Sequence, residues 1–62
     1  MKQYQIAFYY KRITAQPVIY YREFETIKEL KEWAKSILNE SSFYSTFKFN
    51  EIALYQYLHL IK

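Results

Sequence analysis

The stretch that decides the fold is residues 26–40, TIKELKEWAKSILNE. Thr26 followed three residues later by Glu29 is a capping box, in which the threonine hydroxyl accepts the N3 amide and the carboxylate reaches back to the cap. The stretch therefore predicts an amphipathic helix that ends near Glu40, where two serines begin a loop. Its apolar residues recur at helical spacing and form a single stripe: Ile27, Leu30, Trp33, Ala34, Ile37 and Leu38.

Residues 3–11, upstream of the helix, predict a strand. Aromatic and aliphatic residues alternate there with period two, which is typical of a strand that is buried on one face. The face expected to meet the core carries Tyr4, Ile6, Phe8 and Tyr10. The opposite face carries Gln3, Gln5, Ala7, Tyr9 and Lys11.

Residues 18–24 predict a second strand, antiparallel to the first. The intervening segment contains Pro17 and no glycine, so we expect a longer loop and not a two-residue turn. Phe24 directly precedes the helix, where an apolar residue commonly packs on the first turn, so Val18, Tyr20 and Phe24 are expected to face inward. A bulge or a one-residue slip would exchange Tyr20 and Tyr21.

The segment from Phe43 to the end is ambiguous. From residue 52 onward apolar residues surround a helical wheel and no convincing N-cap precedes them, which favours a strand over residues 52–61. Residues 43–50, with Phe47 and Phe49, either begin that strand or form a separate short one. We therefore expect one α+β domain, 1–62, with a ββαβ element order and ββαββ as the alternative. The expected sheet is antiparallel and three-stranded, in the order 2-1-3, with the helix on one face.

The composition argues against catalysis. The chain has no Gly, Cys or Asp and a single His. Loops that cradle phosphate need glycine, and metal sites need several His, Cys or acidic ligands at suitable spacing. Nothing in the sequence orders His59 with a serine and a glutamate. We expect no enzyme, no cofactor, no metal site and no small-molecule substrate.

Two further expectations concern location and origin. No signal peptide is recognisable, and the longest apolar run is about half of the ~20 residues that would span a bilayer. We expect a cytoplasmic protein without membrane contact. Residue types with AT-rich codons dominate, as they do in AT-rich genomes, and a chain this short suits a phage or mobile element.

The aromatic excess predicts a contact surface. Eight Tyr, five Phe and one Trp are more rings than one helix on a small sheet can bury, and exposed rings usually mark an interface. The face that the helix leaves open is expected to carry Tyr9, Tyr21, Tyr55 and Tyr57.

Three partners fit such a face. We expect a host protein, bound and inhibited or modulated through the tyrosine face or through an edge strand at 18–24 or 52–61. A second copy of the chain would also relieve the small core, so a homodimer is expected. The alternative is single-stranded DNA or RNA, with bases stacked on tyrosines and phosphates held by basic side chains. Those side chains are Lys11, Arg12, Arg22 and Lys48.

A basic ridge on the helix has two interpretations. Lys28, Lys31 and Lys35 fall within about 60° of one another on one flank. They form either an ordinary solvated face with a Glu32–Lys35 pair, or a ridge that meets phosphate or an acidic partner.

Overall fold

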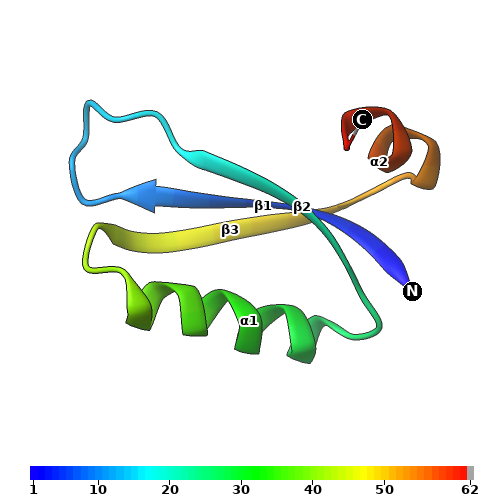
Figure 1. The fold of residues 1–62 in the computed structure, drawn as a ribbon, viewed down its shortest axis with the longest axis horizontal. Coiled ribbons are helices and arrows are strands. Elements are labelled where there is room, and N and C mark those ends of the chain that lie inside the picture. The colour runs from blue at the N-terminus through cyan, green and yellow to red at the C-terminus, as the bar shows by residue number, and fades with distance from the viewer. Residues whose placement is uncertain (62) are drawn as a thin grey trace.

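A computed structural model describes residues 1–61 of the chain. The elements follow in the order β1 (Lys2–Tyr10), β2 (Val18–Phe24), α1 (Ile27–Glu40), β3 (Tyr44–Ile52) and α2 (Leu54–Leu60) (Figure 1). The three strands form one sheet in the order β2-β1-β3, and β1 pairs antiparallel with both neighbours. The predicted α+β fold with strand order 2-1-3 is confirmed, and a short C-terminal helix is added to it.

Helix α1 begins and ends where its sequence predicts. The Thr26 hydroxyl accepts the backbone N–H of Glu29 at 3.2 Å, which satisfies one of the amides that the first turn leaves unpaired. The Glu29 carboxylate accepts the backbone N–H of Glu25 at 3.3 Å, one residue before the cap. The capping box is therefore confirmed on its threonine side and displaced by one residue on its glutamate side.

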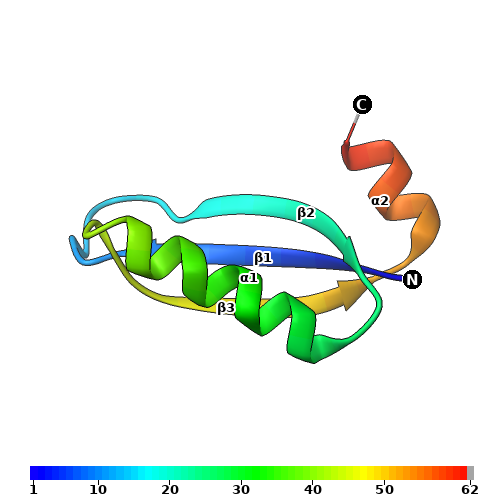
Figure 2. The same cartoon turned by 60° about the horizontal axis from the view of Figure 1, so that its bottom comes forward.

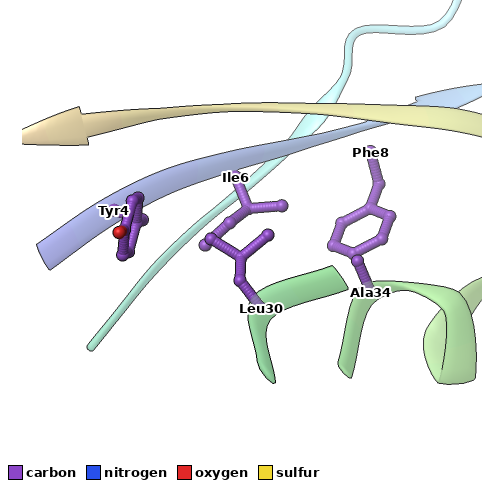
Figure 3. Packing of buried hydrophobic residues seen from close by; sticks show 5 residues of the cluster. All are labelled: Tyr4, Ile6, Phe8, Leu30 and Ala34. Carbon is purple, nitrogen blue, oxygen red and sulfur yellow. The ribbon is translucent and has the colours of Figure 1, made fainter. Parts of the chain in front are cut away.

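The core lies between α1 and β1 (Figure 3). Leu30 and Ala34 from α1 pack against alternate residues of β1, and all five side chains are at most 3% exposed. The buried residues of this cluster are Tyr4, Ile6, Phe8, Leu30 and Ala34.

Aromatic rings enclose this core. Trp33 of α1 has its ring centroid 5.6 Å from that of Tyr20 and 5.6 Å from that of Phe24. The predicted inward facing of β2 is therefore confirmed, since both rings of that strand pack on the helix. Edge-to-face contacts of this kind add roughly 0.5–1.5 kcal/mol each beyond the area they bury, which helps a chain this small to fold.

The predicted third strand at 52–61 is wrong. The strand is β3, Tyr44–Ile52, and the segment after it forms the helix α2. Phe47 and Phe49 explain the difference, because both rings pack on the core from β3. Since β2 already occupies one edge of β1, the other edge accepts a single strand, and residues 44–52 fill it. The alternative ββαββ order is also not observed in residues 1–61.

Candidate functional site

Helix α1 covers one face of the sheet, and we call the opposite side of the sheet the outer face (Figure 2). The pairing register shows which side chains share it, because residues directly opposite each other in a ladder point to the same side. The outer face consists of Gln3, Gln5, Ala7 and Tyr9 from β1, Ile19, Tyr21 and Glu23 from β2, and Thr46, Lys48, Asn50 and Ile52 from β3.

Tyr9 and Tyr21 lie on the outer face, as the alternation of their strands predicts. Both are half-buried, and the Nζ of Lys48 lies 5.7 Å from the centroid of the Tyr9 ring. Ile19, paired with Ala7, is the exposed large apolar side chain of this face, with 39% of its surface accessible. The centre of the outer face is therefore apolar and small, and tyrosines flank it.

Tyr55 and Tyr57 do not belong to the sheet, which corrects the predicted four-tyrosine face. Both lie on α2, where Tyr57 is half-buried and Tyr55 is 75% exposed. Helix α2 contacts β1 and lies on the side of the sheet opposite to α1, at the end where β1 begins and β3 ends (Figure 1). The two pairs of tyrosines are thus presented by different elements.

Helix α2 carries the densest group of exposed apolar side chains in residues 1–61. Five of them, each between 45% and 75% exposed, form what we call the α2 patch: Leu54, Tyr55, Leu58, Leu60 and Ile61. No residue of α2 is buried. Residues 54–61 contain no Lys, Arg, Asp or Glu, and His59 is the only ionisable side chain among them apart from the tyrosines.

The sequence of α2 contains a helix signal that is hard to recognise, because apolar residues occupy every side of its helical wheel. Gln56 stands at the N3 position after Ala53, and its side-chain oxygen accepts the Ala53 backbone N–H at 3.3 Å. This is the glutamine half of a capping box. In addition, Leu54, Leu58 and Ile61 recur at i, i+4 and i+7, the spacing of one helix face.

Lys11 and Arg12 lie in the loop after β1, at the end of the sheet remote from α2 (Figure 1). The backbone N–H of Lys11 donates to the carbonyl of Phe43 at 2.9 Å, which joins this loop to the one between α1 and β3. A pocket of about 410 Å³, open to solvent, lies between the two loops. It is lined by Tyr10, Lys11, Arg12, Ala15, Ser42 and Phe43.

Arg22 lies on the α1 side of the sheet, away from Tyr9 and Tyr21. Its guanidinium carbon is 5.2 Å from the Tyr20 ring centroid and 5.9 Å from that of Trp33. Its Nη1 donates to the carbonyl of Tyr21 at 2.9 Å. Arg22 thus covers the aromatic core and is not placed to contact a ligand together with the outer-face tyrosines.

The lysine ridge of α1 is exposed and lies on the other side of the molecule from the outer face. Within residues 1–61 the structure has one ion pair, Lys2 to Glu51 at 3.6 Å, so the predicted Glu32–Lys35 pair is not present. The ridge residues are Lys28, Lys31 and Lys35.

The remaining chemistry of the described residues is sparse. Residues 1–61 contain no group of three His, Cys or acidic side chains that could hold a metal ion. Neither of their two helices has the length and apolar content needed to cross a membrane. Partial burial raises the pKa of the Tyr44 hydroxyl, and the neighbouring Tyr10 side chain raises it further.

Comparison of the chain with protein-family models, with curated proteins and with solved structures finds no match.

Proposed function

We propose that this chain is a non-catalytic module that binds another protein. Its contact surfaces are the outer face, which meets that protein, and the α2 patch. The observation that carries the proposal is apolar surface left in solvent: Ile19 beside Tyr21 on the face that α1 does not cover, and the five large side chains of the α2 patch. Contiguous exposed apolar surface of this kind usually marks a protein interface.

The distribution of charge supports a protein partner over single-stranded nucleic acid. A stacking platform for bases needs several exposed rings with cations beside them. The outer face has two half-buried tyrosines, one of them under Lys48, and the α2 patch has no Lys or Arg. The other basic side chains of residues 1–61 are divided among the loops, the α1 side of the sheet and the helix α1.

The two free edges of the sheet indicate how the partner would bind. In residues 1–61, β2 and β3 each pair on one side only, so each has an edge whose backbone groups can take an added strand. Strand β2 is the better candidate, because Ile19 and Tyr21 on the outer face adjoin that edge.

The origin proposed for the chain is a phage or mobile element of an AT-rich bacterium. Amino acids with AT-rich codons are abundant in the sequence, which supports an AT-rich genome. The partner would then be a bacterial host protein, held in an inhibited or altered state.

The test is an affinity capture with matched charge variants. Ile19→Glu introduces a carboxylate at the exposed apolar point of the outer face, and Ser36→Glu introduces the same charge on the exposed surface of α1. We expect a bacterial host protein to be retained by the wild-type chain and by Ser36→Glu and to be lost with Ile19→Glu, while circular dichroism shows both variants folded. Retention by all three chains would show that the outer face is not the binding site.

A parallel titration addresses the alternative ligand. A fluorescent single-stranded oligonucleotide is added to the wild-type chain at two salt concentrations. We expect no saturable binding. Affinity that is strong at low salt and falls steeply as salt rises would contradict the proposal in favour of phosphate contacts.

A further inference from the structure

We propose that the α2 patch is a self-association surface, covered in solution by the α2 patch of a second copy related by a two-fold axis. The inference rests on the proposed function in taking the α2 patch as part of the contact surface. It divides that surface into two parts with different occupants: the patch meets a second copy, and the outer face is left for the other protein.

The first argument is that α2 lacks the support that a short helix needs. Isolated helices of fewer than about 12–15 residues are marginal in water, and most helical stability comes from burying an apolar face. Helix α2 has seven residues, none of them buried, and its N-cap Ala53 has no side-chain acceptor for the first-turn amides. A cover over the patch would supply the missing burial.

The second argument is charge. The chain carries a formal net charge of +3, so two copies repel each other on average. A two-fold contact brings a patch against itself, so any charge in the patch is present twice within the contact. Residues 54–61 contain no Lys, Arg, Asp or Glu, whereas the outer face has Lys48 and Glu23 and α1 has its lysine ridge. The α2 patch is the surface on which this cationic chain can meet a second copy without that repulsion.

The third argument is area. Leu60 lies on the Gln56 side of the helix, so four side chains can share one contact: Leu54, Tyr55, Leu58 and Ile61. Each is about half to three-quarters exposed, and together they present on the order of 500 Å² per copy. Two such surfaces reach the ~1,000 Å² that a specific interface should clear. The patch is thus just large enough for a dimer of modest affinity, and neighbouring parts of the sheet would add to it.

The helical spacing identifies the centre of the contact. At 100° per residue Leu54 and Leu58 are about 40° apart, and Tyr55 is about 60° beyond Leu58. These three are also the most exposed side chains of the patch. Gln56 lies about 160° from Leu58, on the opposite side of the helix. The chain therefore offers a matched pair of positions for a test.

The test is sedimentation equilibrium of the wild-type chain and two charge variants from micromolar to submillimolar concentration. Leu58→Glu places a carboxylate within the proposed interface, where it would face its own copy. Gln56→Glu adds the same charge to the same helix and keeps an oxygen that can accept the Ala53 N–H. We expect a wild-type dimer, a Gln56→Glu dimer, and a dissociation constant raised by roughly 100-fold or more in Leu58→Glu.

Crosslinking provides a second measurement that does not depend on a disruptive charge. Because the chain has no cysteine, a single introduced one can pair only with its own copy. Leu54→Cys, Tyr55→Cys and Leu58→Cys are oxidised separately, with Lys31→Cys on α1 as the control. A two-fold axis that passes through the centre of the proposed contact brings the nearest of these positions within disulfide distance of its copy. We expect that position to crosslink much faster than the control.

The outcomes separate this inference from the proposed function. A wild-type chain that is monomeric throughout the range, a Leu58→Glu variant that dimerises like wild type, or equal crosslinking at all four positions would overturn the inference. Capture of another protein, lost with Ile19→Glu, would still stand in each of those cases. Conversely, a dimer that dissociates in Leu58→Glu but captures no protein would support the inference and contradict the proposed function.

Discussion

Helices α1 and α2 both carry several large apolar side chains, but they hold very different positions in the molecule. Helix α1 has fourteen residues, a threonine cap and a stripe that buries Leu30 and Ala34 under the sheet. Helix α2 has seven residues, an alanine at its N-cap and no buried residue. The difference teaches that a one-sided apolar stripe with a cap fixes where a helix packs, whereas a segment that is apolar all round is placed by what the rest of the fold leaves free.

The largest expected effect comes from truncating one leucine in each helix. Leu30 is fully buried, so Leu30→Ala should lower the free energy of unfolding by about 2–5 kcal/mol, from lost burial and the cavity left behind. Leu58 is 52% exposed, so Leu58→Ala should cost less than about 1 kcal/mol in the monomer. Urea unfolding followed by Trp33 fluorescence, at a concentration where the chain is monomeric, measures both. Similar losses would mean that α2 is part of the monomer's core.

A smaller pair of effects, opposite in sign, is expected at the two helix caps. Thr26→Ala removes the hydroxyl that accepts the Glu29 N–H and should destabilise the protein by about 1 kcal/mol. Ala53→Ser supplies α2 with the acceptor that it lacks, and should raise the helical signal in circular dichroism with a gain of about 0.5 kcal/mol. If Ala53→Ser leaves both helicity and stability unchanged, α2 is limited by something other than its cap.

The smallest effect concerns Tyr44, at the start of β3 beside the aromatic core. Its pKa is raised by partial burial and by Tyr10, so the folded state favours the neutral hydroxyl. The stability that this provides is fully present below the pKa of the unfolded chain, near 10, and is lost as pH rises through the folded pKa. We expect stability to fall above about pH 10 and Tyr44→Phe to weaken that fall. Urea midpoints at pH 8 and pH 11 test this; an equal fall in both chains would contradict it.

The sequence predicted an element and its facing correctly wherever one face of that element is apolar. The capping box and stripe of α1, the alternation of β1 and the inward facing of Tyr20 and Phe24 all agree with the structure. In each case burial on one side gives the sequence a period, and the period identifies the element and its facing.

The C-terminal third could not be placed by periodicity alone. Residues 52–61 fit both a strand and a helix, because their apolar residues occupy every side of the wheel. Sheet pairing resolved the ambiguity: Phe47 and Phe49 hold residues 44–52 against β1, and residue 54 onward has no strand left to pair with. At the start of α2, the Gln56 side chain accepts the Ala53 backbone N–H.

The predicted tyrosines of the candidate site also differ in how well the sequence places them. Alternation along the strands places Tyr9 and Tyr21 on the outer face. The position of Tyr55 and Tyr57 depends on whether their segment is a strand or a helix, which alternation does not decide. The three predicted basic binding residues do not form one group in the structure. Lys11 and Arg12 lie together in the loop after β1, whereas Arg22 faces the α1 side of the sheet. The α2 patch was not predictable until the third strand had been located.

The sequence by itself determined the helix at 27–40 and the hairpin before it, because local capping and period encode these elements directly. Only the tertiary structure decided which C-terminal segment pairs with β1. Consequently only it determined that a short, uncharged apolar helix is left in solvent. The physical reason is that one sheet edge can satisfy the backbone hydrogen bonds of only one strand. Segments that are distant in the sequence compete for that edge, so no local pattern shows which of them pairs there.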